Sequence, residues 1–256
     1  MTHYILLFIL LIERFYMIWK AILFLLMTFV IITGISFPIV VNPTSWTQFP
    51  IIPGLEEKAK IIFFHVPTAW LSVVAFLMAM IYGIKYLRNK NLDDDSRSSA
   101  ALQIGMMFSI LATVTGSIWA KFNWGSFWNW DPRETSIFIL LLIYGSLFAL
   151  RSAIDNEDKR ARLSAVYSII AFLTVPFFIF IMPRIMMGLH PGSLEIDPVT
   201  NQVVAGTNPV VDFKMNGSMR LVFFTSLGAF TILYYWMWSI RAKAIIIQEN
   251  LSKKLN

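Results

Sequence analysis

Long apolar blocks separated by short polar segments dominate the chain. Six of these blocks are long enough to cross a bilayer, because an α-helix needs about 20 residues to span roughly 30 Å of hydrocarbon. The pattern therefore predicts an all-α, polytopic membrane protein with six transmembrane helices in a single membrane domain, residues 1–256. We expect the fourth helix to begin before its apolar block, which is the shortest. The predicted spans are residues 17–41, 61–87, 101–120, 135–150, 163–182 and 219–241.

An additional apolar run, Tyr4–Ile12, lies near the N-terminus and is too short to span a bilayer. It lacks the basic residues that precede the apolar core of a signal peptide, and no A-x-A-like cleavage site follows it. We interpret it as an interfacial segment or as an extension of the first helix.

Composition supports a membrane protein and excludes several kinds of chemistry. Hydrophobic residues make up 57% of the chain and charged residues only 14%, about half the charged share of soluble domains. The chain has no cysteine, which excludes thiol–disulfide exchange and cysteine-ligated iron–sulfur clusters. The formal charge is +6, but the basic residues lie between apolar blocks rather than in one patch. We therefore expect a lipid bilayer and no nucleic acid among the partners.

The distribution of Lys and Arg predicts the orientation, since cytoplasmic loops are enriched in both. With the N-terminus inside, fourteen of the 21 basic residues lie on the inner side and seven on the outer side. Both termini are then cytoplasmic. We expect the inner loops 88–99 and 151–162 to be solvated connectors and any chemistry to lie in the outer loops. The outer loops are residues 42–60, 122–133 and 184–218.

The chain has three histidines, His3, His65 and His190. An isolated histidine at a helix end is more often an interfacial polar residue than a ligand. His65 and His190, however, are predicted at the same outer depth beside an aromatic loop, and two imidazoles can fill both axial positions of haem iron. A zinc site would need further ligands, to which Asp131 or Glu195 could contribute, but it would leave the tryptophans of that loop unexplained.

The aromatic loop reads WGSFWNWDPRET from Trp124 to Thr135. Tryptophans gather at membrane interfaces without fixed spacing, and this belt role suffices for others in the chain (Trp19, Trp46, Trp236 and Trp238). It fits the tryptophans in and just before the loop less well, because large planar faces held close together suit a large planar ligand. The tryptophans assigned to such a platform are Trp119, Trp124, Trp128 and Trp130.

The end of this loop also has a structural interpretation. Asp131 is a good helix N-cap, Pro132 suits the first helical position, and Glu134 completes a capping box. Arg133 could pair with a haem propionate through two parallel hydrogen bonds. Contact with lipid phosphate is an equally plausible role for this arginine.

The stretch WGSFWNWD resembles the tryptophan-rich signature of the haem-handling proteins of cytochrome c biogenesis, whose pattern is close to W-G-x-x-W-x-W-D. Six spans, with one outer histidine before the motif and one after it, make the chain similar to the CcmC family from about Ile61 to the last span. The resemblance implies that His65 and His190 are axial haem ligands. It also implies an outer platform composed of Trp119, Trp124, Gly125, Trp128, Trp130 and Asp131.

The same resemblance implies a function and partners. CcmC-type proteins hold haem, here a transient b-type haem, at the outer face and present it to a haem chaperone of the CcmE type. The further partners implied are other membrane subunits of cytochrome c maturation, including an ABC-type transporter. The location implied is a bacterial cytoplasmic (inner) membrane, with a mitochondrial inner membrane as the alternative.

Two departures keep other interpretations open. Phe127 stands where CcmC proteins often have tryptophan, and DPRET is nearer to the CcsA-type cytochrome c synthases. Those proteins are usually larger and carry an additional histidine pair within the membrane, whereas no predicted span here contains a histidine except His65 near its outer start. A small-solute permease is a third possibility, although no internal repeat is evident and Pro176 is the one candidate helix break. No nucleophile or acid–base pair is evident, so we expect haem delivery rather than independent enzymatic turnover.

Overall fold

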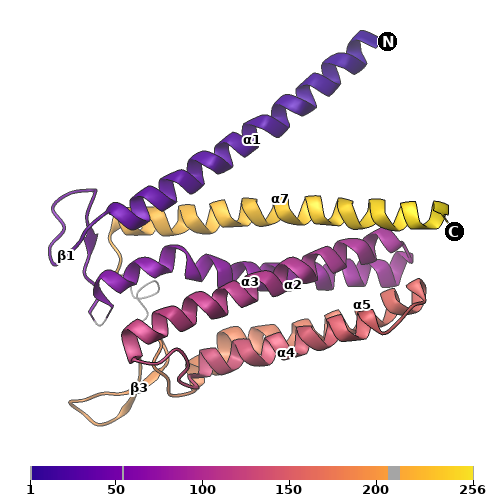
Figure 1. The fold of residues 1–256 in the computed structure, drawn as a ribbon. Helices are drawn as coiled ribbons and strands as arrows, with labels where there is room; N and C mark the ends of the chain where they lie inside the picture. The colour runs from indigo at the N-terminus through magenta and orange to yellow at the C-terminus, as the bar shows by residue number, and fades with distance from the viewer. Residues whose placement is uncertain (1, 54, 207–213, 256) are drawn as a thin grey trace.

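The computed structural model describes residues 2–53, 55–206 and 214–255, with side chains from Met17 onward. Within these residues, six helices are long and apolar enough to cross a membrane, as the apolar pattern predicts. Five of them run roughly alongside one another, while the first diverges from the last toward the end that carries both termini (Figure 1). The long helices are α1 (Thr2–Ser36), α2 (His65–Asn89), α3 (Leu92–Trp124), α4 (Pro132–Ser152), α5 (Glu157–Pro176) and α7 (Gly217–Leu255).

Short elements gather at the end of the bundle opposite the termini (Figure 1). Two parallel strands, β1 and β2, follow the first helix, and the antiparallel pair β3 and β4 lies in the loop before the last helix. None of these strands exceeds three residues, so the fold remains all-helical in character. These elements are β1 (Ile39–Val40), β2 (Phe49–Pro50), the 3₁₀ helix η1 (Glu56–Phe63), the π-helix η2 (Phe177–Ile181), α6 (Met182–Ile185), β3 (Leu194–Ile196) and β4 (Val203–Ala205).

Some helices begin or end at residues other than the ends of the apolar blocks, because of local sequence. The fourth helix begins at Pro132, earlier than its apolar block, as expected. The first ends at Ser36, so the predicted end at residue 41 is wrong. Pro38 explains the difference, because proline has no N–H to donate and disfavours helical geometry in the residue before it. At its other end α1 is continuous from Thr2, which favours the helix-extension interpretation of the Tyr4–Ile12 run.

The fifth span is interrupted at Pro176. Regular α-helical bonding stops there, a π-helical turn follows over Phe177–Ile181, and α6 completes the span. A π-helical turn accommodates the hydrogen bond that proline cannot make. The expected break is therefore a change in helical pitch that leads the chain out toward the loop containing His190.

The expectation of a solvated connector is wrong for the first inner loop, residues 88–99, whereas residues 151–162 are mostly exposed or half-buried. Only Lys90 and Asn91 separate α2 from α3, and the Asn91 side chain accepts a hydrogen bond from the Asp93 N–H at 2.9 Å. Asp95 is buried in the first turns of α3, where it accepts two hydrogen bonds from Arg151 of α4, at 2.7 and 2.9 Å. Pairing of opposite charges thus allows this polar sequence to pack between helices.

The core that holds the helices together combines small and aromatic side chains. Phe76 of α2 stacks on Tyr144 of α4 with ring centroids 3.5 Å apart. A Cβ at Gly105 of α3 would lie 2.8 Å from the Phe76 ring, so glycine is needed for this approach. Trp238, expected in an interfacial belt, is instead buried in this core, and its Nε1 donates to the Arg97 carbonyl at 3.1 Å.

A second hydrophobic cluster lies at the end of the bundle opposite the termini. Phe49 of β2, Phe63 of η1, Trp119 of α3 and Met219 of α7 are buried together. The Trp119 Nε1 donates to the Lys58 carbonyl at 3.2 Å. Segments distant in the sequence therefore meet beneath the aromatic loop and hold it in place.

Orientation in the membrane remains a prediction of the charge count, and it can be measured. Reporter fusions after Asn91 and Asn156, which lie at the end that carries the termini, should report the cytoplasm, and a fusion after Asn201 should report the outside, because basic loops are retained inside. A reporter active on only one side of the membrane distinguishes these positions. A consistently inverted pattern would contradict the orientation and place the aromatic loop inside.

Candidate functional site

The residues singled out in the sequence converge on one end of the bundle. His65 is the first residue of α2, Trp119 and Trp124 are in the last turns of α3, and Asp131 immediately precedes α4. His190 lies in the loop that leads from α6 to β3. These positions are contributed by segments far apart in the chain, and only the packing of helices brings them together.

His190 is enclosed by aromatic rings and one carboxylate. Its Nδ1 is 2.9 Å from Oδ1 of Asp131. The imidazole meets the Trp124 ring edge to face at 4.8 Å and lies 5.7 Å from the Trp119 ring. The two indoles themselves pack edge to face at 5.0 Å. Trp119 and Trp124 therefore enclose the His190 ring.

The Asp131 carboxylate is held as an anion. It is fully buried and accepts hydrogen bonds from the N–H groups of Leu189 at 2.6 Å and Arg133 at 2.9 Å, in addition to the His190 contact. Burial alone would raise the pKa of Asp131, but the His190 hydrogen bond and charge and these two N–H groups together lower it below its usual value. An ionised carboxylate only accepts hydrogen bonds. The Nδ1 of His190 is therefore the donor, and in the neutral form of the ring Nε2 carries the lone pair.

Asp131 serves its predicted structural role as well. It caps α4, and the capping box with Glu134 is confirmed. The Glu134 Oε2 accepts from the Asn129 N–H at 2.6 Å and the Asp131 N–H at 3.3 Å. The contact with His190 was not evident in the sequence, because 59 residues separate the two side chains. One carboxylate thus fixes both the start of a helix and the orientation of an imidazole.

Gly188 permits this arrangement. A Cβ on Gly188 would lie 2.9 Å from Oδ2 of Asp131 and 3.1 Å from Cδ of Pro132. Any larger side chain would push the loop bearing His190 away from the carboxylate.

His65 is also oriented by a hydrogen bond at Nδ1, but its partner is a threonine hydroxyl. Its Nδ1 lies 2.9 Å from Oγ1 of Thr115 on α3. The single hydroxyl proton of Thr115 is donated to the Leu111 carbonyl at 2.7 Å, so the hydroxyl oxygen accepts from the histidine. The Nδ1 of His65 is then the donor and Nε2 again carries the lone pair.

Gly116 brings α3 close to the His65 ring. A Cβ on this glycine would lie 2.9 Å from Cε1 of His65. His65 also lies within electrostatic range of His190 and Arg133. Both imidazoles are therefore near one another with their Nδ1 atoms engaged. Both side-chain hydrogen bonds of these imidazoles involve Nδ1, and the backbone of Ala112 is a further hydrogen-bond partner of the His65 ring.

The remaining tryptophans form a separate pair. Trp128 and Trp130 meet edge to face at 5.8 Å, and Trp128 also contacts Phe138 at 6.2 Å. Trp130 is 70% exposed and has a left-handed backbone (φ 56°). Gly125, with φ 81°, ends α3 in the left-handed region that glycine adopts most readily. The tryptophans therefore present faces in several directions rather than one flat surface.

Arg133 lies beside these groups without a full set of partners. One terminal nitrogen donates to the Pro191 carbonyl at 3.5 Å, while Nε is buried and has no acceptor among the described residues. Arg184 is a nearby like charge. A buried guanidinium with an unused donor indicates a place for an anionic group.

A cavity of about 430 Å³ opens beside the loop. Glu195, the other acid considered for a zinc site, lines it together with Asp131. However, no group of three or more His, Cys, Asp or Glu side chains is placed to hold a metal ion within residues 2–53, 55–206 and 214–255. The zinc interpretation therefore gains no support. The other residues that line the cavity are Asn129, Trp130, Pro132, Met187, Gly188, Leu189, Leu194 and Ile196.

Comparison with known proteins gives consistent matches. The heme exporter protein C of Bradyrhizobium diazoefficiens is 39% identical over 121 residues, which cover 47% of this chain and 46% of that protein. The heme exporter protein C of Paracoccus denitrificans is 28% identical over 197 residues, 77% of this chain and 76% of that protein. A putative cytochrome c biosynthesis ccmC-like mitochondrial protein of Marchantia polymorpha is 35% identical over 124 residues, 48% of this chain and 52% of that protein. The chain thus matches about half the length of the first and third of these relatives.

A family model covers the chain almost completely. The model described as CcmC, heme exporter protein C, matches residues 10–256, which include all six candidate membrane spans and the aromatic loop. The resemblance carried by the tryptophan motif is therefore confirmed at the level of the whole sequence, and the chain belongs to the CcmC family.

Proposed function

We propose that this protein binds haem transiently at the outer face of the membrane, with His65 and His190 as the axial ligands. The observation that carries the proposal is the state of the two imidazoles. Each Nδ1 lies 2.9 Å from an oxygen of its own partner, Thr115 or Asp131, which leaves Nε2 of each neutral ring as the nitrogen that would bind iron. Iron binds the unprotonated nitrogen of a neutral imidazole, and a hydrogen bond at the other nitrogen fixes the orientation of the ring.

The two proposed ligands differ in strength because their hydrogen-bond partners differ. His190 is paired with a carboxylate, which strengthens an imidazole as a ligand, whereas His65 is paired with a neutral hydroxyl. The His190 bond to iron is then the firmer one. A weaker ligand on the other side suits a protein that must release its haem, because only one strong bond has to be exchanged.

The surroundings fit the rest of the ligand. Trp119 and Trp124 line the histidine, and the exposed Trp128–Trp130 pair supplies further planar surface for the porphyrin. Gly125 and Asp131 hold this loop in place. The buried guanidinium of Arg133, with its unused Nε, would pair with a propionate.

Haem is cargo in this proposal rather than a resident cofactor, and the activity is delivery. The relatives are named heme exporter protein C or ccmC-like cytochrome c biosynthesis protein. We therefore propose a role in cytochrome c maturation, with transfer to a haem chaperone of the CcmE type and association with other maturation subunits, including an ABC-type transporter. The location would be a bacterial inner membrane, or a mitochondrial one. Membership of the CcmC family favours this role over a CcsA-like ligation subunit or a solute permease.

The histidine assignment predicts the effect of three alanine substitutions. His65→Ala and His190→Ala should each reduce retained haem severalfold and alter the Soret and visible bands, because each removes one iron bond. The loss should be greater for His190→Ala, whose ligand is paired with the carboxylate. His3→Ala is the control and should change neither amount nor spectrum. Visible spectroscopy of purified protein decides this, and the opposite pattern, with His3→Ala alone losing haem, would overturn the assignment.

The close approach of α3 to His65 predicts a second effect. Gly116→Ala places a methyl group where the His65 ring now lies, so the ring must move away from its productive position. We expect haem retention to fall about tenfold, a change equivalent to roughly 1.4 kcal/mol, with normal insertion. Gly145→Ala is a matched control, since nothing lies within 4 Å of the added Cβ. Equal haem contents in the two variants would contradict the proposed place of His65.

The tryptophan loop predicts a third effect. Replacing Trp124, Trp128 and Trp130 together by Leu keeps the loop apolar but removes its planar faces. Each stacked ring is worth on the order of 1 kcal/mol beyond its buried area, so haem occupancy and chaperone loading should both fall while insertion is unchanged. Trp46→Leu, at a tryptophan 60% exposed in another outer loop, is the control. Full chaperone loading by the triple variant would leave an interfacial belt as the role of these residues.

A further inference from the structure

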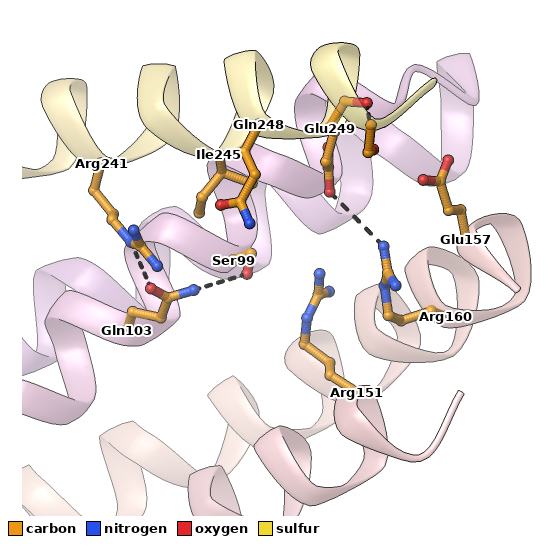
Figure 2. A pocket seen from close by; sticks show the side chains of 10 residues that line it. Ser99, Gln103, Arg151, Glu157, Arg160, Arg241, Ile245, Gln248 and Glu249 are labelled. Carbon is orange, nitrogen blue, oxygen red and sulfur yellow. Dashed lines mark hydrogen bonds and ion pairs between the residues drawn. The ribbon is translucent and has the colours of Figure 1, made fainter. Parts of the chain in front are cut away.

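A polar cavity of about 370 Å³ lies at the end of the bundle that carries the termini, far from the proposed haem site. Figure 2 shows side chains from α3, α4, α5 and α7 converging on it. Three of them are arginines contributed by three different helices, Arg151, Arg160 and Arg241. No sequence motif marks a site here, and the apolar pattern predicts that the inner loops are solvated connectors.

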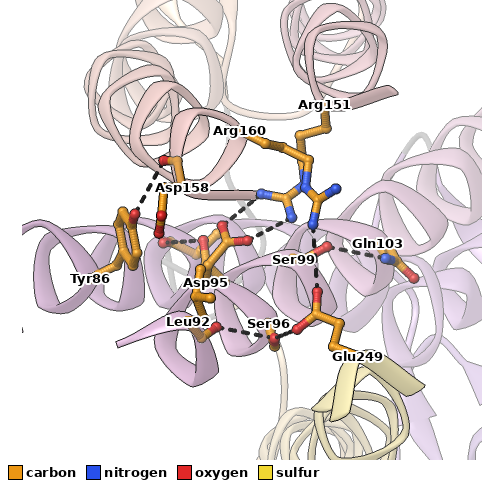
Figure 3. A network of polar contacts seen from close by, with 12 residues as sticks. Tyr86, Leu92, Asp95, Ser96, Ser99, Gln103, Arg151, Asp158, Arg160 and Glu249 are labelled. Carbon is orange, nitrogen blue, oxygen red and sulfur yellow. Dashed lines mark hydrogen bonds and ion pairs between the residues drawn. The ribbon is translucent and has the colours of Figure 1, made fainter. Parts of the chain in front are cut away.

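The three arginines differ in how fully they are neutralised. Arg151 gives both terminal nitrogens to the buried Asp95 carboxylate, at 2.7 and 2.9 Å (Figure 3). Arg160 is 3.7 Å from Glu249, which is an ion pair but too long for a hydrogen bond. Arg241 donates its Nε to Gln103 at 2.7 Å and has no carboxylate within ion-pair distance among the described residues. Two guanidiniums therefore have donors available to an additional anion.

Each acid at or near the cavity already has a partner. Glu157 pairs with Lys253 at 2.9 Å. Glu249 accepts a hydrogen bond of 2.6 Å from Ser96, which holds its carboxylate against α3 (Figure 3). Asp95 is occupied by Arg151. The positive charge that remains is that of Arg241, together with the loosely paired Arg160.

The rest of the lining favours a phosphate oxyanion. Hydroxyls and an amide, from Ser99, Ser252 and Gln248, surround the arginines, and such groups with guanidiniums are the usual ligands of phosphate. No aromatic ring and no histidine lines the cavity, so it offers neither a stacking face nor an iron ligand for haem. The cavity is therefore chemically distinct from the proposed haem site.

The position along the helices indicates where the phosphate would come from. Arg241 ends the last apolar block of the chain, and Ile240 and Ile247 of α7 are 54% and 59% exposed beside it. Basic pockets between transmembrane helices at the level of the headgroups bind anionic lipids. We propose that this cavity binds the phosphate of an anionic phospholipid, with Arg160 and Arg241 as the ligands and the acyl chains against the exposed apolar face of α7.

The test uses the full chain, purified in detergent, with phosphatidylglycerol, phosphatidylcholine or inorganic phosphate as the probe. Native mass spectrometry measures lipid retention, and thermal unfolding measures stabilisation. We expect phosphatidylglycerol to bind about tenfold more tightly than phosphatidylcholine and inorganic phosphate alone to have no effect. Equal binding of the two lipids would overturn the proposal. Stabilisation by inorganic phosphate equal to that by phosphatidylglycerol would assign the cavity to a soluble phosphate and overturn the lipid.

Matched variants separate this cavity from general surface charge. The double variant Arg160→Gln, Arg241→Gln should weaken phosphatidylglycerol binding roughly 25-fold, because about fivefold is expected for each arginine. Lys243→Gln removes an exposed charge that does not line the cavity and should leave binding within about twofold. An equal loss in Lys243→Gln, or none in the double variant, would contradict the site.

One substitution should increase binding, which a folding defect cannot do. Glu249→Gln removes the carboxylate that competes for Arg160 and should tighten phosphatidylglycerol binding several-fold. Unchanged or weaker binding would overturn the role of Arg160. Haem retention at the other end should be unaffected in every variant, so the outcome is independent of the proposed haem function.

Discussion

In a bilayer every backbone N–H and C=O must find a partner within the protein, and this constraint shapes the molecule. It makes the six spans helical and, apart from the π-helical turn Phe177–Ile181 within the fifth span, confines irregular backbone to their ends. Strands, 3₁₀ and π turns and left-handed residues such as Trp130 and Gly125 all lie outside the regular α-helical segments. The groups capable of chemistry are consequently divided between the two ends of the bundle, with an apolar core between them.

At the end bearing the aromatic loop, one buried carboxylate connects local and long-range structure. Asp131 caps α4 through backbone N–H groups and at the same time bonds His190 from a loop that follows α6. Because its charge is compensated by three donors, it remains ionised despite burial. The N-cap residue of α4 therefore also orients His190, the proposed haem ligand. Such a hydrogen bond fixes the orientation of a ligand ring in a binding site.

The other end is held by opposite charges in addition to the apolar cluster around Tyr86, Ala161 and Ala165. Asp95 and Arg151 join α3 to α4, and Glu249 joins α7 to Ser96 of α3. Buried ion pairs contribute little net stability but strongly disfavour arrangements in which one partner is left alone. They set which helices meet at this end, and they leave between them the polar cavity that we assign to an anionic lipid.

The sequence alone determined the helical class, the six spans and the family, because apolar length and a spaced tryptophan motif are properties of consecutive residues. It also determined the capping box of α4, whose residues are three apart. Tertiary structure decided the pairing of His65 with Thr115 and of His190 with Asp131, which lie 50 and 59 residues apart. It likewise buried Asp95 and Trp238, which the sequence assigned to a solvated loop and an interfacial belt. The physical reason is the same in each case. A polar side chain can lie in water or between helices, and it is buried between helices only where packing brings it a hydrogen-bonding or charged partner.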